Sequence, residues 1–202
     1  SQVASEKGIA SARRWYWRQT VRTTAHLLGA GFRTAPRTIT VVVNGDTINE
    51  ADETFFVNLS NAANATISDA QGIVTIANDD ALPQLSINNV TLAEGNSGTT
   101  NAVLTVSLSA ASALPVSVDW ATANGTASAP GDYLANSGTL TFAAGQTTRT
   151  ITVVVNGDTI NEADETFFVN LSNAVNATIS DAQGVVTIAN DDALPQLTIN
   201  NV

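Results

Sequence analysis

The chain contains a long internal repeat. Residues 37–90 recur as residues 149–202, a period of 112 residues. The two copies differ at only three positions, which are Ala63/Val175, Ile73/Val185 and Ser86/Thr198. Solenoid repeats have periods of about 20 to 50 residues, so a period this long indicates one whole domain per copy. We therefore expect a slice of a tandem array of domains.

Residues 86–192 form one full module of alternating sequence. Leu104, Val106 and Leu108 alternate with polar residues, and six further segments have the same pattern. Period-two alternation indicates half-buried strands. The strands are expected at 86–92, 102–109, 115–122, 138–142, 148–156, 166–173 and 184–190. Seven strands in a module of this size are typical of an immunoglobulin-like antiparallel β-sandwich, so the fold class is all-β with tandem modules.

The residues outside this module can be assigned by comparison with it. Residues 37–80 repeat only its C-terminal half, and residues 81–85 are expected to be a linker containing Pro83. Residues 193–202 are expected to be the next linker and the first strand of the next module. Within the full module, Asn124-Gly125 and Asn156-Gly157 are predicted turn dipeptides, where the glycine tolerates a positive φ.

Charge and composition exclude several functions. Residues 38–202 contain a single basic residue, Arg149, against seventeen acids. Such a surface repels nucleic-acid phosphates and anionic membranes and attracts cations. With no Cys and only His26, thiolate zinc sites and imidazole clusters are excluded. No apolar run reaches the roughly eighteen residues of a membrane span, so we expect no direct membrane insertion in this segment.

Most acids of the full module lie in loops that are expected at the same end of the sandwich. If successive strands are antiparallel, the loops after alternate strands lie at the same end of the sandwich. Eight of the ten acids then fall at one end: Glu94, Asp132, Asp158, Glu162, Asp164, Glu165, Asp191 and Asp192. Asp119 and Asp181 fall elsewhere and are expected to be ordinary surface charges.

Eight carboxylates around one edge repel one another unless a cation neutralises them. Ca²⁺ accepts six to eight oxygen ligands in flexible geometry, whereas Mg²⁺ requires a strict octahedron and retains water. The alternative is that the acids only keep the module soluble. Because the next module begins at this acidic end, bound Ca²⁺ would lie at the hinge between modules and stiffen it.

Five segments resemble the Calx-beta domain in their order and spacing. They are Ala93–Gly98, Gly125–Tyr133, Gly138–Phe142, Asn161–Phe167 and Thr187–Asp192. The resemblance covers all of residues 86–192. The family occurs in sodium–calcium exchangers, integrin β-subunits, adhesion receptors and bacterial secreted repeat proteins. In the exchangers these loops bind Ca²⁺, so the resemblance implies a calcium-binding module.

Carried over by position, the resemblance implies seven metal ligands: Glu94, Asp132, Asp158, Glu162, Glu165, Asp191 and Asp192. The sequence departs from the strongest calcium binders at Asn156-Gly157-Asp158 and at Asn190, where those members have further acids. Fewer charges favour weaker binding, so one or two sites of moderate affinity are expected.

The first copy is expected to hold a weaker, incomplete site. The acids expected in that site are Asp46, Glu50, Glu53, Asp79 and Asp80. The counterparts of Glu94 and Asp132 would fall within or before residues 1–36, a net-basic segment that matches nothing in the full module. The abrupt loss of similarity favours a frameshift, recombination or assembly error; a real basic peptide, or a strand at 13–23, remains an alternative. We expect this copy to be under-packed.

These observations predict a calcium-binding structural or adhesive repeat of a large extracellular or cell-surface protein. Neighbouring modules are the expected partners, with a possible protein or glycan adhesion partner and no nucleic acid. A passive spacer or protein-interaction module that binds no calcium is the alternative. We expect no enzyme, although Glu162 and Glu165 resemble a glycosidase pair in chemistry. Trp120 is expected to be a core residue, and Tyr133 to anchor a loop.

Overall fold

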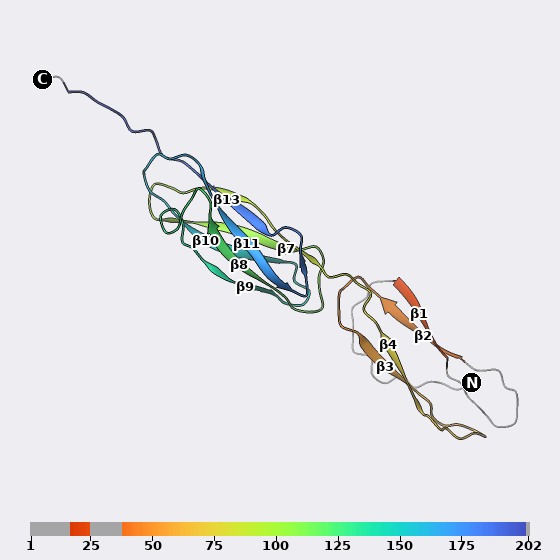
Figure 1. Ribbon diagram of the computed structural model, residues 1–202. Coiled ribbons are helices and arrows are strands. Elements are labelled where there is room, and N and C mark those ends of the chain that lie inside the picture. Colours follow the sequence, from red (N-terminus) through yellow and green to blue (C-terminus); the bar gives the residue numbers. More distant parts are fainter. Residues whose placement is uncertain (1–16, 25–37, 201–202) are drawn as a thin grey trace. The chain divides into compact units, whose positions relative to one another are not determined.

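The computed structural model describes residues 17–24 and 38–200 and divides into two compact units, residues 1–80 and 81–202 (Figure 1). All regular structure in the described residues is β-strand. The first unit contains the half-copy of the repeat, and the second contains the full module.

The second unit is a sandwich of two sheets. The four-stranded sheet has the order β10 (Thr148–Asn156), β7 (Thr99–Leu108), β5 (Gln84–Ile87) and β12 (Thr178–Ile179). The five-stranded sheet has the order β6 (Val90–Ala93), β13 (Gln183–Ala189), β11 (Glu165–Val175), β8 (Val116–Asn124) and β9 (Ser137–Phe142). The all-β, immunoglobulin-like sandwich is confirmed.

The alternating residues form the core between these sheets. Leu104 and Val106 of β7 are fully buried, as are Val118 of β8 and Phe167 of β11. Burying each such side chain stabilises the fold by about 1.5–3 kcal/mol. Trp120, which we expected in the core, is only half-buried and packs against its margin beside Gly138.

The single strand expected at 86–92 was wrong. The chain forms β5 in one sheet and β6 in the other, with β5 antiparallel to β7 and β6 parallel to β13. Asn88 and Asn89 make the crossing: the Asn88 side chain accepts from the Thr105 N–H at 2.6 Å, and the Asn89 side chain accepts from the Val185 N–H at 2.8 Å. These amides replace strand hydrogen bonds where the chain changes sheet.

The first strand also starts earlier than expected. β5 begins at Gln84, inside the segment 81–85 that we expected to be linker, and Leu85 is fully buried. The other six expected strands lie within a few residues of β7, β8, β9, β10, β11 and β13. The two-residue β12, which pairs in parallel with β5, was not expected because two residues carry no alternation signal.

Two strand pairs form among the described residues of the first unit. β1 (Trp17–Thr24) is antiparallel to β2 (Thr38–Gly45), and β3 (Glu53–Asn58) is antiparallel to β4 (Gln71–Ile76). By the repeat, β2, β3 and β4 correspond to β10, β11 and β13. β1 thus takes the place of β7, as the alternative of a strand at 13–23 required; residues 13–16 lie outside the described part.

Identical side chains are more exposed in the first unit than in the second. Phe55 and Leu59 are half-buried, whereas their counterparts Phe167 and Leu171 are 0 % and 5 % exposed. The sequence of these strands is the same, so the difference comes from the strands that surround them. The first unit is less well packed, in agreement with the expectation.

Candidate metal centre

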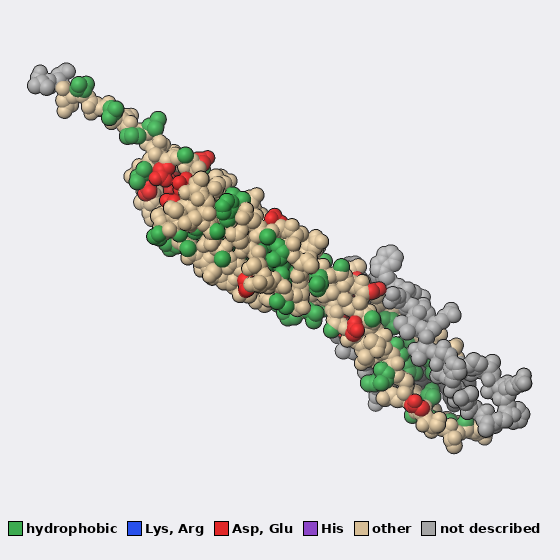
Figure 2. All heavy atoms as spheres, viewed as in Figure 1, with side chains coloured by type: hydrophobic (Ala, Val, Ile, Leu, Met, Phe, Trp, Pro, Cys, Tyr) green, Lys and Arg blue, Asp and Glu red, His purple; other side chains and the backbone are tan. Residues whose placement is uncertain are grey.

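The acids of the second unit gather at one end of the sandwich. Figure 2 shows this acidic group where the chain continues towards residue 200. Within the described residues, two sets of carboxylates have oxygens within 4.8 Å of one another, and these sets are Glu94, Asp191, Asp192 and Asp132, Glu162, Glu165. Loop parity therefore predicted which end collects the acids, but not that they form two clusters.

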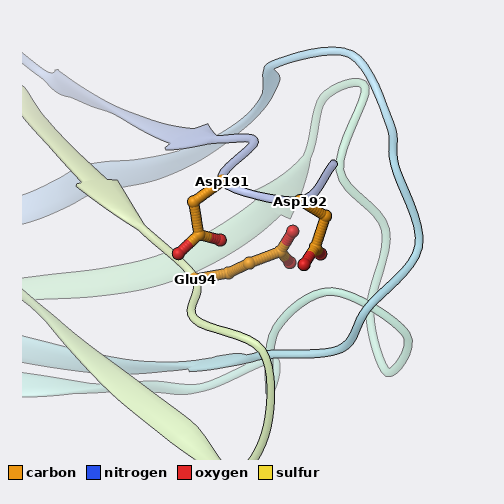
Figure 3. Close-up of side chains that lie close together, drawn as sticks. All are labelled: Glu94, Asp191 and Asp192. Atoms are coloured by element: carbon orange, nitrogen blue, oxygen red, sulfur yellow. The ribbon is translucent and has the colours of Figure 1, made fainter. Parts of the chain in front are cut away.

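The first cluster, Glu94 with Asp191 and Asp192, joins the end of β6 to the end of β13. These two strands run parallel in adjacent positions, so the residues that follow them emerge side by side. In Figure 3 the Glu94 and Asp192 side chains point towards each other and Asp191 lies beside them. The Asp191 carboxylate also accepts a 3.3 Å hydrogen bond from the Gly95 N–H.

Two members of the first cluster are buried. Glu94 is 7 % exposed and Asp192 is 9 % exposed. One Asp192 oxygen, Oδ1, accepts from the Asn96 side-chain amide, but Oδ2 is buried and has no hydrogen-bond partner. A buried carboxylate oxygen with no donor is costly, so this position favours a cation as the missing partner.

Burial and charge also alter the titration of Glu94. Its pKa is raised from 4.5 to about 7, mainly by burial and then by the charge of Asp158. Glu162, Asp192 and Asp191 add smaller repulsions. A carboxyl held this way prefers its neutral form unless a cation lies next to it.

The second cluster, Asp132 with Glu162 and Glu165, is more open. Glu162 is exposed, while Asp132 and Glu165 are half-buried. The Asp132 carboxylate accepts a 2.6 Å hydrogen bond from the Ser128 N–H. Burial, followed by the Asp132 charge, raises the pKa of Glu165.

One of the seven expected ligands, Asp158, lies outside both clusters, as does Asp164 of the same acidic end. Asp158 accepts a hydrogen bond from the Ile160 N–H at 2.7 Å, and its charge contributes to the raised pKa of Glu94. Asp119 accepts from the Thr139 hydroxyl at 2.6 Å, and Asp181 accepts from the Gln183 N–H at 3.3 Å. The last two are placed away from the clusters, as expected.

Asparagine side chains hold the loops of the site together. The Asn190 Oδ1 accepts from the Glu162 N–H at 3.1 Å, and its Nδ2 donates to the Asp192 carbonyl at 3.2 Å. Asn161 donates to the same carbonyl at 2.7 Å, and Asp164 accepts from the Asn190 N–H at 3.0 Å. We call these four hydrogen bonds the asparagine clamp. From the sequence, Asn190 was expected only to lack the charge of an acid at that position.

Gly157 lies where two loops pack closely together. Gly125 and Gly157 were predicted in turn dipeptides that tolerate a positive φ, but the positive-φ glycines among the described residues are Gly95, Gly98 and Gly145. A Cβ on Gly157 would lie 2.1 Å from the Gly95 carbonyl oxygen. Gly157 is needed because the loop after β6 packs directly against its backbone.

Tyr133 fixes the loop that carries Asp132. Its ring is buried and stacks on Phe167, with centroids 4.1 Å apart and an interplanar angle of 9°. Its hydroxyl donates to Asn124 at 2.6 Å. Tyr133 therefore anchors a loop, as expected, and holds the adjacent carboxylate in position.

The chain resembles known proteins in sequence and in fold. The Calx-beta domain model matches residues 32–80 and 79–192, well over half of the chain. The chain belongs to the Calx-beta family. Sodium/calcium exchanger 2 of Homo sapiens and of Rattus norvegicus is 41 % identical over 68 residues, which is 34 % of this chain. The chain spans only 7 % of the length of these exchangers.

The chain is also similar to solved structures. The structure titled "Crystal structure of CBD12 from CALX1.2" is 25 % identical with a TM-score of 0.50, covering 54 % of this chain and 46 % of that one. The "Crystal structure of calcium binding domain CBD12 of CALX1.1" is also 25 % identical, with a TM-score of 0.49 and the same coverage. Within the described residues, no helix is long and apolar enough to cross a membrane.

The Calx-beta half-copy repeats the clamp but not the clusters. Asn78 accepts from the Glu50 N–H at 3.1 Å and donates to the Asp80 carbonyl at 3.1 Å. Asn49 donates to the same carbonyl at 3.0 Å, and Asp52 accepts from the Asn78 N–H at 2.8 Å. The clamp thus forms in a copy whose described residues include no counterpart of Glu94.

Acids of the half-copy lie close enough for their charges to raise one another's pKa. Burial, then the charges of Asp46, Glu53 and Asp80, raises the pKa of Glu50. The pKa of Asp80 is raised by burial and by Asp79 and Asp46. No group of three metal-ligand side chains forms among the residues described in this unit.

Proposed function

We propose that the Calx-beta module at 86–192 binds Ca²⁺ at its acidic end. The observation that carries the proposal is Asp192 Oδ2, a buried carboxylate oxygen without a donor beside the buried Glu94. A second ion would be held by Asp132, Glu162 and Glu165, with Asp158 near the first cluster. Carboxylates and carbonyls are hard oxygen ligands, which fits Ca²⁺.

The ion would supply charge neutralisation and cross-linking. Glu94 follows β6 and Asp192 follows β13, so one cation between them would join two loops that repulsion otherwise separates. Asp192 immediately precedes the segment 193–200. Bound Ca²⁺ would therefore stiffen the place where the chain leaves the module.

In the longer protein we propose a structural role. Near-identical copies in tandem suit an extracellular or cell-surface array whose modules space an adhesive part, with neighbouring modules as the main partners and no catalysis. The half-copy at 37–80, with Asp46, Glu50, Glu53, Asp79 and Asp80, would bind Ca²⁺ weakly. The exchanger relatives favour a membrane-associated parent protein.

Thermal unfolding tests the metal site. The thermal unfolding of the second unit would be followed in Ca²⁺, in Mg²⁺ and in EDTA. A ligand at a hundred times its dissociation constant stabilises a protein by about 2.7 kcal/mol, which is several degrees for a domain of this size. We expect that rise in Ca²⁺ and much less in Mg²⁺.

Two matched substitutions give the control. Asp192→Asn should remove most of the Ca²⁺-dependent rise, since it neutralises the buried ligand. Asp181→Asn makes the same change on a carboxylate outside the clusters and should leave the rise intact. Identical melting in all three solutions would instead support the passive spacer.

A further inference from the structure

One edge of the four-stranded sheet in the second unit is only partly covered. β10 is the outermost strand of that sheet, and β7 is its neighbour on one side. On the other side a loop covers the end of β10, because the Leu134 N–H donates to the Val154 carbonyl at 2.9 Å. The Asn156 N–H donates to the Asp132 carbonyl of the same loop at 2.9 Å. No described residue bonds to residues 148–152 from this side.

The free backbone groups of this edge follow from strand geometry. In an antiparallel pair, alternate residues direct both their N–H and their C=O towards the same neighbour. The residues of β10 that bond to the covering loop are even-numbered, so Thr148, Thr150 and Thr152 face that side too. Their N–H and C=O groups are therefore turned away from β7. This stretch of five residues is about 17 Å long and can accept another strand.

The side chains beside this edge form an open groove. Its volume is about 480 Å³, and it is lined by Thr105, Leu140, Thr148, Arg149 and Thr150. Leu140 comes from β9, the outermost strand of the other sheet, and packs against the core. The groove is therefore bounded by the outer strands of both sheets. A strand added to β10 would direct alternate side chains towards Leu140.

Arg149 gives the groove a charge that the rest of the module lacks. It is the only Lys or Arg in residues 38–202, which contain seventeen acids. Its side chain is exposed and forms no ion pair with a described carboxylate. The acidic end lies beyond Asn156, which is about 23 Å of extended strand away. Since charges are screened over about 8 Å at physiological salt, Arg149 is available to a carboxylate from outside the module.

We infer that the free edge of β10 binds an extended acidic peptide from a partner protein. The peptide adds as an antiparallel strand along residues 148–152, with main-chain hydrogen bonds to the three threonines that face it. An acidic side chain of the peptide lies opposite Arg149. An apolar side chain two residues before it lies opposite Ile151, towards Leu140. Arg149 and Ile151 take the positions between hydrogen-bonded pairs, where side chains on adjacent strands approach most closely.

A second copy of this chain fits the edge less well than an acidic peptide does. Antiparallel pairing of two such edges around Thr150 would make the two Arg149 side chains diagonal neighbours on one face, with no acid between them. Charge on an edge strand opposes such pairing. An acidic partner converts the same charge into an attraction. The inference does not depend on calcium, because it uses neither acidic cluster.

Titration of the isotope-labelled full chain with short peptides, followed by NMR, tests the inference. The probe is acetyl-TVTET-amide, whose glutamate would lie opposite Arg149 and whose valine would lie opposite Ile151. It should shift the amide signals of Thr148, Thr150 and Thr152 in a saturable way. The matched control is acetyl-TVTKT-amide. It should bind about fivefold more weakly, because an exposed ion pair becomes a pair of like charges.

Two kinds of variant identify what is recognised. Thr150→Pro removes a free N–H but no hydrogen bond to β7, so the second unit should melt as before while peptide binding is lost. Thr150→Ala keeps that N–H and should bind the probe normally. Arg149→Glu should reverse the preference and bind the lysine peptide more tightly than the glutamate peptide.

Three results would overturn the inference. The first is a wild-type chain that shows no saturable shift, or that binds both peptides equally. The second is equal binding by Thr150→Pro and Thr150→Ala. The third is self-association of an Arg149→Gln chain in sedimentation together with no peptide binding by the wild type, since Arg149 would then only protect the edge from pairing.

Discussion

Asn190 shows how one side chain can hold the loops of an acidic site together through hydrogen bonds. Its amide accepts from one loop and donates to another, joining Glu162 to Asp192. A carboxylate at this position could accept but could not donate to the Asp192 carbonyl. The absence of an acid at 190 therefore gives the site a clamp in place of a ligand.

Asn190→Asp should destabilise the calcium-free module. It removes a donor to the Asp192 carbonyl and adds charge to an acidic end, so we expect a loss of about 1–3 kcal/mol in unfolding free energy. Urea unfolding in EDTA measures it. Asn101→Asp adds the same charge on an exposed residue of β7 and should cost far less. Equal losses for the two would contradict the clamp.

The raised pKa of Glu94 predicts a pH-dependent stability. Its folded-state pKa is about 7 against 4.5 for the free group, so the folded state favours the protonated form. This contribution is fully present below pH 4.5 and is lost as pH rises through 7. In EDTA the melting temperature should therefore fall between pH 5 and pH 8, and the rise caused by Ca²⁺ should grow over the same range.

Glu94→Gln provides the control for the pH dependence. The glutamine does not titrate, so the fall in EDTA should become shallower, and the Ca²⁺-dependent rise should shrink at every pH. A wild-type melting temperature that is constant from pH 5 to pH 8 in EDTA would show that Glu94 is not held in its neutral form.

Gly157→Ala should separate the loops of the site. The added Cβ would meet the Gly95 carbonyl oxygen at 2.1 Å, so the backbone has to move. We expect a loss of about 2 kcal/mol or more, together with weaker Ca²⁺ binding. Gly131→Ala, whose Cβ would lie 3.5 Å from the nearest backbone oxygen, should be nearly neutral. Similar melting of both variants would contradict the close approach.

Among the elements, the first strand shows what sequence patterns can and cannot reveal. Alternation located six strands because each keeps one phase along its length. In β5 the buried positions are Leu85 and Ile87, whereas in β6 the inner positions are Val90 and Leu92. The phase slips by one residue at Asn88-Asn89. That slip is present in the sequence, but we expected one strand across it, so the change of sheet was not predicted.

The clusters depend on information that strand patterns lack. Parity places whole loops at one end, and it did so for the acids of the second unit. It does not say which carboxylates meet, because that depends on loop conformation around Gly157 and on the amides of Asn161 and Asn190. The burial of Asp192 follows from these contacts and had no sequence signal.

A matched pair of substitutions measures what β5 contributes. Leu85→Ala removes a fully buried side chain and should cost about 2–5 kcal/mol. Leu197→Ala makes the same change in the repeated segment, where the side chain is 100 % exposed, and should cost almost nothing in dilute solution. Urea unfolding compares them. Comparable losses would show that 196–199 is buried after all.

For the whole molecule, the two units should unfold separately. The first unit exposes side chains that the second buries, for example Phe55 against Phe167, so it should melt at a lower temperature. Calorimetry should resolve two transitions, and Ca²⁺ should raise the upper one far more than the lower one. Asp192→Asn should then change the upper transition alone. A single transition raised as a whole by Ca²⁺ would contradict independent units.

The asparagine clamp also determines the path by which the chain leaves each copy. In both copies two amides hold the last carbonyl, that of Asp80 or Asp192, before the polypeptide continues. Neutral amides do not gain or lose protons over the physiological range and do not respond to chelators. The backbone conformation after Asp80 and Asp192 should therefore stay the same in acid and when calcium is scarce. A bound metal can change how rigid the nearby loops are. The backbone path out of each copy is determined by the asparagine side-chain amides.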